Sequence, residues 1–175
     1  MVKPKQALLI IDAQVNILLG ENPVYRAALV KDNLLHLLEK ARQKDIPVVF
    51  VRNNGGPDAP DTPGSPGWEI DPAFSTRPGD ITIDKWYPDA FKDTPLQAEL
   101  AAREIRSLVI GGMQSEYCID TTSRGAVELG YQVTVANDAH STYASGSSSA
   151  SDIIERINRD LAGVVSLTAA QDFNL

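Results

Sequence analysis

The stretch Ala7-Leu8-Leu9-Ile10-Ile11, followed at once by Asp12, decides the fold class of this chain. Its apolar residues run without a break, whereas a strand with one face in water alternates apolar and polar residues. Short, β-branched runs of the same kind recur further along the chain, at Ile46–Val51, Ser107–Ile110, Val133–Ala136 and Gly163–Leu167. Runs of this character are typical of strands in a parallel sheet that is covered on both faces.

Helical patterns separate these runs. They cover Tyr25–Lys44, Leu96–Ile105, Ser115–Leu129 and Ser149–Leu161. In the first of them apolar residues recur every three to four positions, and Gly130 is a suitable stop for the third. The alternation of strand and helix predicts an α/β fold, a doubly wound three-layer sandwich with a mostly parallel sheet of about six strands flanked by helices. A length of 175 residues predicts a single domain over residues 1–175.

The segment Asn53–Pro95 differs from the rest of the chain. It holds eight of the eleven prolines, and we expect only one short strand, Ile81–Lys85, to interrupt it. A long loop in a compact domain is usually functional or disordered. Because this one carries Trp68, Trp86 and further aromatic residues, we expect it to pack down as a lid or as the wall of a pocket.

Composition and charge exclude several function classes. Lysine and arginine number 16 against 23 aspartates and glutamates, a net charge of −7 with no basic cluster, which argues against nucleic acid and anionic membranes as partners. No apolar run approaches the ~20 residues of a membrane span, and the start of the chain does not resemble a signal peptide. A single cysteine favours a reducing, cytoplasmic compartment, and with only two histidines a Cys/His zinc site lacks ligands.

Reactive side chains follow the predicted strands at the end where ligands bind in open α/β sheets. These residues are Asp12 and Gln14, Asn53, Lys85 and Trp86, Gln114 and Cys118, and Asn137 to His140. The sequence contains no Gly-x-Ser-x-Gly elbow, no dinucleotide-binding glycine motif and no Walker phosphate loop, so we expect no cofactor. An acid, an amine and a thiol are therefore expected to meet at one edge of the sheet.

Each of these residues has a structural interpretation as well as a chemical one. Cys118 is either a buried structural thiol or a nucleophile; with Ser115 as the helix N-cap, the first-turn N–H groups would favour its thiolate. Asp12 is either a satisfied strand-end carboxylate or a general acid and base. Lys85 is either solvated or holds Asp12 ionised. His140 is an alternative partner for Cys118, but we weigh it below Asp12 because its segment is equally explained as a loop.

Three segments, in order, resemble the motifs of the isochorismatase-like cysteine hydrolases. They are Leu9–Gln14, Asp84–Leu96 and Gly111–Thr122, continued by Ala126, Gly130–Tyr131 and Asn137–Ala139. The match in motif order and spacing extends from about residue 7 to residue 168.

The resemblance implies a catalytic triad of Cys118, Asp12 and Lys85. It also implies a cis peptide bond between Met113 and Gln114, with the backbone N–H groups of Gln114 and Cys118 forming an oxyanion hole. Nicotinamidases of this family carry an Asp-x-His-x-x-His metal site after the second strand. The loop 53–66 has no histidine, so we expect no metal. A homo-oligomer, dimer or tetramer, is also implied.

The function that follows is a metal-independent cysteine hydrolase. It would cleave a C–N bond of a small non-peptide amide, ureido or carbamoyl compound through a thioester. The alternatives are an isochorismatase-type vinyl-ether hydrolase, which needs no cysteine, and an inactive small-ligand-binding module of the same fold. For the pocket we expect Gln14, Asn53, Trp68, Trp86 and Tyr117, and from their side chains a compact, largely uncharged substrate.

Overall fold

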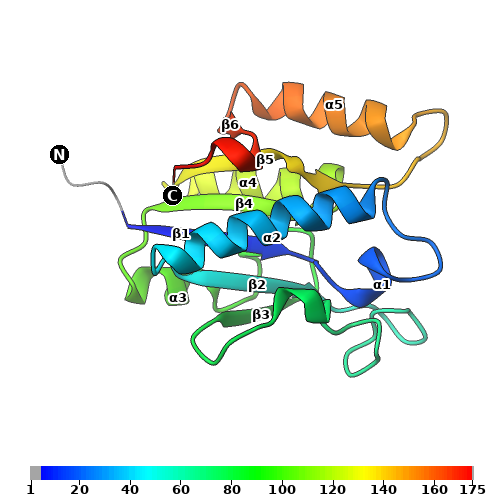
Figure 1. The fold of residues 1–175 in the computed structure, drawn as a ribbon, viewed down its shortest axis with the longest axis horizontal. Helices are drawn as coiled ribbons and strands as arrows, with labels where there is room; N and C mark the ends of the chain where they lie inside the picture. Colours follow the sequence, from blue (N-terminus) through cyan, green and yellow to red (C-terminus); the bar gives the residue numbers. More distant parts are fainter. Residues whose placement is uncertain (1–4, 175) are drawn as a thin grey trace.

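A single sheet of six strands, in the order β3-β2-β1-β4-β5-β6, forms the centre of the molecule (Figure 1). The computed structural model describes residues 5–174. Residues 1–4, part of the start that we compared with a signal peptide, and residue 175 lie outside that range. The strands are β1 (Gln6–Ile11), β2 (Val48–Asn53), β3 (Ile81–Lys85), β4 (Ser107–Met113), β5 (Gln132–Ser141) and β6 (Ser166–Thr168). Every neighbouring pair is parallel, which confirms the predicted doubly wound fold.

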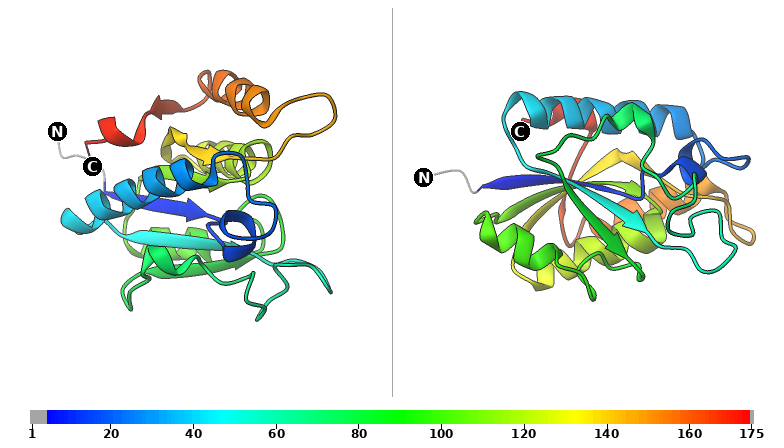
Figure 2. Two further views of the ribbon diagram at one scale, coloured as in Figure 1. Left: turned by 45° about the vertical axis from the view of Figure 1, so that its right-hand side comes forward. Right: turned by 90° about the horizontal axis from the view of Figure 1, so that it is seen from below.

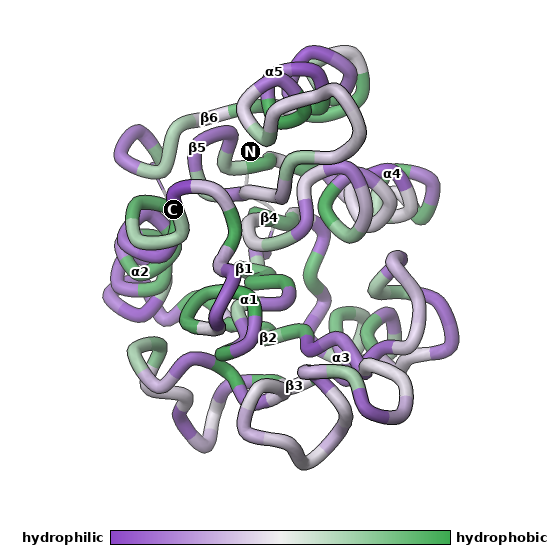
Figure 3. Tube along the Cα trace, turned by 90° about the vertical axis from the view of Figure 1, so that its right-hand side faces the viewer, coloured by the Kyte–Doolittle hydropathy of each residue, from purple (hydrophilic) through white to green (hydrophobic). Residues whose placement is uncertain are grey.

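Helices cover both faces of the sheet (Figures 2 and 3). They are α1 (Val15–Leu18), α2 (Ala27–Gln43), α3 (Leu96–Ala102), α4 (Asp120–Glu128) and α5 (Ala150–Leu161). Short turns η1 (Pro72–Phe74) and η3 (Ala170–Asp172) are 3₁₀-helical, and η2 (Ser115–Ile119) is a single π-helical turn that leads into α4. In Figure 3, α2 lies on one side of the sheet and α3 and α4 lie on the other.

Strand β1 explains why the opening apolar run is unbroken. Its side chains alternate between two cores: Ala7, Leu9 and Ile11 pack with α3, α4 and α5, whereas Leu8 and Ile10 pack with α2 and η1. All five are fully buried. A strand with a core on each face has no solvent side on which a polar residue is favoured.

Strand order reverses between β1 and β4, which are neighbours in the sheet although β2 and β3 lie between them in the chain. In sheets of this class the crevice beyond this reversal is where ligands bind. Asp12 leaves the end of β1 there in a left-handed conformation (φ 52°), and η2 begins two residues after β4 ends.

The segment Asp138–Ser141 is strand rather than loop, so our expectation of a loop around His140 was wrong. Strand β5 continues to Ser141, and His140 pairs with Gly112 of β4. The register between the two strands shifts between Ile110 and Gly112. Strand β5 has three extra residues between Val135 and His140, and such an irregularity carries no hydrophobic pattern of its own, so the sequence does not display it.

The long segment after β2 packs against α1. Backbone N–H groups of Val15 and Asn16 donate to the carbonyls of Glu69 and Gly67, at 2.9 and 3.0 Å. The strand predicted at Ile81–Lys85 is present as β3, at the edge of the sheet. Within residues 5–174, no helix has both the length and the apolar character needed to cross a bilayer.

Gly112 of β4 allows a close approach to the backbone of β1 at the strand reversal. Its φ of 127° is rare for other residues, and a Cβ there would lie 2.0 Å from the carbonyl oxygen of Ile11. We expect Gly112→Ala to lower the free energy of unfolding by more than ~1 kcal/mol, because neither the conformation nor the space suits alanine. Urea denaturation measures this.

The matched control is Gly163→Ala, where an added Cβ meets no atom within 4 Å. Equal stability of the two variants would show that β1 and β4 tolerate a wider spacing than the structure has.

Candidate active site

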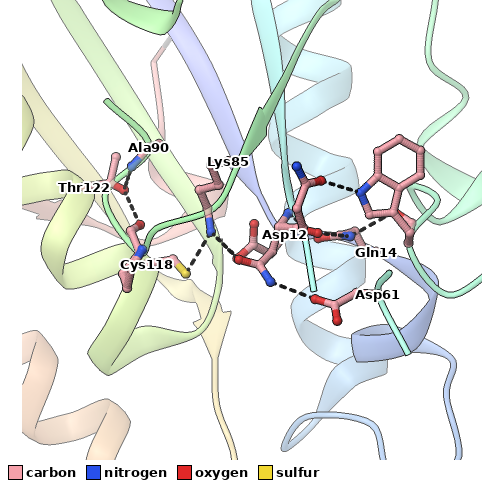
Figure 4. Close-up of polar contacts among 11 residues, drawn as sticks. Asp12, Gln14, Asp61, Lys85, Ala90, Cys118 and Thr122 are labelled. Carbon is pink, nitrogen blue, oxygen red and sulfur yellow. Dashed lines mark hydrogen bonds and ion pairs between the residues drawn. The ribbon is translucent and has the colours of Figure 1, made fainter. Parts of the chain in front are cut away.

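Three side chains from three different elements meet beyond the carboxyl ends of β1 and β4 (Figure 4). The Lys85 ammonium donates to Asp12 Oδ2 at 3.1 Å and to Cys118 Sγ at 3.2 Å. A third donation reaches Asn53 Oδ1 at 3.2 Å. An ammonium group has three N–H bonds, so all of its donor capacity is satisfied within this cluster.

Lys85 reaches the cluster because it is the last residue of an edge strand with alternating burial. Ile83 and Lys85 are buried, whereas Thr82 and Asp84 are exposed. The Lys85 side chain is fully buried, so the solvated interpretation is wrong for it. Burial by itself lowers the pKa of Lys85, but the Asp12 carboxylate and then Cys118 outweigh it and raise the pKa above its usual value.

The chain after Lys85 is fixed to helix α4. Thr122 Oγ1 accepts from the backbone N–H of Ala90 at 3.0 Å and donates to the carbonyl of Pro88 at 3.3 Å. Thr94 Oγ1 donates to the carbonyl of Ala90 at 2.6 Å. These bonds explain why threonines stand at two positions of the motifs. They also hold the backbone that carries Lys85 near Cys118 (Figure 4).

Asp12 is the acid of the cluster and is only partly satisfied. Its Oδ2 accepts from Lys85, while Oδ1 is buried and has no hydrogen-bond partner within residues 5–174. Burial raises the pKa of the Asp12 carboxyl above its usual range, against the attraction of Lys85. A carboxyl group with a raised pKa and a free oxygen suits the uptake and return of a proton.

Cys118 lies within the π-helical turn η2 and is 8% exposed. Burial, and next the negative charge of Asp12, raise its pKa to about 12, although Lys85 opposes them. Our expectation that the helix start favours the thiolate was therefore wrong for the free protein. The thiol is protonated at neutral pH, with the carboxylate of Asp12 as its charged neighbour.

Ser115 does not cap the helix, contrary to our expectation; Gln114 occupies the N-cap position and makes no side-chain capping bond. The Ser115 hydroxyl lies 2.8 Å from His140 Nδ1 instead. His140 Nε2 lies 2.9 Å from Asn158 Oδ1, and Asn158 Nδ2 donates to the carbonyl of Asn137 at 3.0 Å. Because Asn158 uses its nitrogen for this bond, its oxygen faces His140, and an oxygen can only accept. His140 Nε2 is therefore the protonated ring nitrogen, and Nδ1 accepts from the Ser115 hydroxyl.

His140 is therefore an anchor for the turn that carries Cys118 rather than a hydrogen-bond partner of the thiol. Burial lowers the pKa of His140, which keeps the ring neutral. Both of its ring nitrogens are satisfied by Ser115 and Asn158. The preference for Asp12 over His140 as the neighbour of Cys118 agrees with this geometry.

A cavity of about 300 Å³ opens over the cluster. Of the predicted residues, its wall contains Asp12, Gln14, Asn53, Gln114, Tyr117 and Cys118. The remaining wall residues were not expected from the sequence; they are Asn16, Ile17, Asp61 and Tyr143. These four lie on α1, on the long loop and after β5, where no motif distinguishes them from their neighbours.

The peptide bond between Met113 and Gln114 is cis.

Gln14 lines the cavity but is occupied by the protein itself. Its Nε2 donates to the backbone carbonyls of Asn53 and Trp68, at 3.0 and 2.9 Å. Its Oε1 accepts from the Asn53 N–H at 2.8 Å. Both amide hydrogens are used, so Gln14 holds the end of β2 and the long loop rather than offering donors to a ligand.

Neither tryptophan belongs to the residues that line this cavity, so the structure does not support them as pocket residues. Trp86 is 63% exposed and follows buried Lys85, and successive side chains of an extended segment point to opposite sides. Trp68 donates from Nε1 to Asn54 Oδ1 at 2.8 Å, and the Arg52 guanidinium lies 3.5 Å from the centre of its ring. Trp68 thus stabilises the long loop.

Comparison with known proteins shows the family of the chain. The isochorismatase domain matches residues 6–170. The chain belongs to the isochorismatase domain family. A protein of Oleispira antarctica, solved as an isochorismatase hydrolase, superposes with a TM-score of 0.90 at 30% identity, over 98% of this chain and 97% of that one.

Two relatives of this isochorismatase-family chain have named activities. Streptothricin hydrolase of Streptomyces noursei is 40% identical over 138 residues, which are 79% of this chain and 50% of that protein. Ureidoacrylate amidohydrolase of Methylorubrum extorquens is 29% identical over 139 residues, 63% of this chain and 56% of that protein. The chain thus spans about half the length of these curated relatives.

The residues after β2 do not fit the metal site known from nicotinamidases of the isochorismatase family. The loop 53–66 offers Asn53, Asn54, Asp58 and Asp61, which are two amides and two carboxylates, and no imidazole. Nowhere in residues 5–174 do three or more His, Cys, Asp or Glu side chains gather in a way that could hold a metal ion. Metal independence stays a prediction.

The raised pKa of Cys118 predicts an unusual effect of Asp12→Asn. Asp12 raises the thiol pKa and Lys85 lowers it, so removing the carboxylate leaves only the cation and lowers the thiol pKa. We expect Asp12→Asn to react faster with iodoacetamide than the parent protein at neutral pH, and the parent rate to rise about tenfold per pH unit between roughly pH 7 and pH 9. Because the chain has one cysteine, intact mass reports this rate directly.

Slower alkylation of Asp12→Asn would show that Asp12 already takes the thiol proton in the free protein. Asp45→Asn is the matched control. It removes an exposed carboxylate just before the amino end of β2, whereas the site lies beyond the carboxyl ends of the strands.

Proposed function

We propose that the chain is a hydrolase that cleaves a C–N bond of a small non-peptide amide, ureido or carbamoyl compound, through a thioester on Cys118. The observation that carries the proposal is the Lys85 ammonium within hydrogen-bond distance of both Asp12 Oδ2 and Cys118 Sγ, beside a cavity. Two relatives with the names hydrolase and amidohydrolase support the reaction class.

In the first half of the reaction, Cys118 Sγ attacks the carbonyl carbon of the substrate. Asp12 takes up the thiol proton as the C–S bond forms, so the sulfur is deprotonated only when it is needed. The carbonyl oxygen becomes an oxyanion, which the backbone N–H groups of Gln114 and Cys118 stabilise. Asp12 then gives its proton to the nitrogen, the C–N bond breaks, and the amine or ammonia leaves.

In the second half, water hydrolyses the thioester. Asp12 accepts a proton from the water while the water oxygen bonds to the carbonyl carbon of the thioester. The C–S bond then breaks. The proton returns to Cys118, and the acid product leaves. Lys85 stays protonated throughout and holds Asp12 ionised between proton transfers, so that Oδ1 is available in each half.

A panel of small amides, ureas and carbamoyl compounds tests this function by the release of ammonia or amine. We expect turnover by the parent protein, none by Cys118→Ala, and a loss of about 10²–10⁴-fold in Asp12→Asn, the usual range for a general acid and base. Thermal melts check that each variant is folded. Asp45→Asn is the control and should keep full activity.

Amide turnover retained by Cys118→Ala would contradict the thioester. Hydrolysis of a vinyl ether by both the parent protein and Cys118→Ala, with no turnover of the panel, would favour the vinyl-ether alternative, which does not need the thiol. If no compound is turned over, and Cys118 acquires no acyl group from activated esters, the ligand-binding alternative is the better account.

Exhaustive treatment with EDTA or phenanthroline tests metal independence. We expect activity to survive, because the segment after β2 provides no set of metal ligands. A loss of activity that added zinc or manganese restores would contradict this. The homo-oligomer implied by the resemblance is likewise a proposal, which light scattering on the purified protein tests.

A further inference from the structure

The charge inside the cavity is not balanced. Its wall contains two carboxylates, Asp12 and Asp61, and no lysine or arginine. Asp12 is paired with Lys85. Within residues 5–174 no cationic side chain forms an ion pair with Asp61. Arg52, the charged residue next to Asn53 on β2, pairs with Asp84 and Glu69 instead.

The loop is shaped to hold the Asp61 carboxylate at the cavity. Asn53 Nδ2 donates to Asp61 Oδ2 at 2.7 Å, and the Gly55 N–H donates to the Asp61 carbonyl at 2.8 Å. A Cβ on Gly55 would lie 2.1 Å from Asp61 Oδ1, so the missing side chain of Gly55 makes room for this oxygen. Figure 4 shows Asp61 on the far side of Asp12 and Lys85 from Cys118.

The field of Asp61 reaches the reacting groups. The pKa of Asp12 is raised chiefly by burial, with Lys85 opposing, and the negative charge of Asp61 adds to the rise. An ionised carboxylate only accepts hydrogen bonds, so its natural ligand is a cationic donor. Tyr117 and Tyr143 also line the cavity, and aromatic rings attract cations as well.

We propose that Asp61 is a specificity-determining residue that selects substrates with an ammonium or guanidinium group close to the scissile carbonyl. The inference rests on the proposed function and names the substrate class of that same site. It replaces our expectation of a largely uncharged substrate, which took the pocket polar groups to be Gln14, Asn53 and Gln114 and overlooked Asp61.

A second role for Asp61 has to be separated from this one. Asp61 holds the Asn53 amide, whose oxygen accepts from Lys85, so its loss also disturbs the catalytic cluster. A positioning effect of that kind changes reactions with cationic and neutral molecules equally. Charge selection changes the ratio between them.

The test uses three thiol reagents of similar size: aminoethyl, hydroxyethyl and sulfonatoethyl methanethiosulfonate. Each transfers its alkylthio group to a thiolate, forming a mixed disulfide and expelling methanesulfinate. Cys118 is the only cysteine, so intact mass follows each reaction near neutral pH. Rates are divided by those of mercaptoethanol, which removes the intrinsic reactivity of each reagent. No step requires hydrolysis, so the outcome is independent of whether any amide is turned over.

We expect the parent protein to favour the aminoethyl over the hydroxyethyl reagent about tenfold, in keeping with a charged hydrogen bond, and to disfavour the sulfonatoethyl reagent. Asp61→Asn should remove most of this preference, so that its aminoethyl rate falls about tenfold further than its hydroxyethyl rate. Asp61→Glu should keep the preference. Asp58→Asn, which removes an exposed carboxylate from the same loop, is the control and should resemble the parent.

Absence of a cationic preference in the parent protein would overturn the proposal without any variant. An equal fall in all three rates in Asp61→Asn would also overturn it, and would assign Asp61 to positioning Asn53. The same loss of preference in Asp58→Asn would show that the overall negative charge of the chain, not Asp61, attracts the cation.

Discussion

The buried ammonium of Lys85 is the constraint on which the rest of the site depends. Taking a charged group out of water is costly unless it is paired and its hydrogen bonds are satisfied. The chain meets this requirement with one partner from each of three elements: Asp12 after β1, Asn53 at the end of β2 and Cys118 in η2. Removing any partner leaves part of a buried charge unsatisfied, so the same contacts that organise the chemistry also fix how these three elements meet.

The ion pair also explains why the thiol remains protonated in the free protein. Lys85 neutralises Asp12 but does not leave enough positive charge to ionise a buried sulfur, whose pKa is raised to about 12. In the proposed reaction the proton therefore rests on sulfur and the negative charge on Asp12, and both move only when a substrate carbonyl arrives. In the long loop, Asp61 has no cationic partner within residues 5–174, and we infer that this asymmetry gives the cavity a preference for cationic substrates.

Much of this arrangement could be predicted from the sequence. The unbroken apolar run at Ala7–Ile11 predicts a strand buried on both faces, and residues after such strands converge because parallel strands end at one edge. Cys118, Asp12 and Lys85 were found in this way. The other features could not be predicted, because they depend on the exact path of the backbone. The π-helical turn moves the N-cap from Ser115 to Gln114, and the register shift brings His140 into a strand. The path of the proline-rich loop brings Asp61, and not Asp58, to the cavity.

The charge state of Lys85 is the most direct test of the account. Protein with ¹³C at lysine Cε allows each lysine to be titrated by NMR, and the signal missing from Lys85→Met assigns Lys85. Because Asp12 and Cys118 outweigh burial, the account predicts that Lys85 remains protonated beyond the titration of the exposed lysines, above its ordinary pKa of 10.5. A Lys85 signal that titrates below that value would contradict the buried ion pair, and with it the proposed role of Asp12.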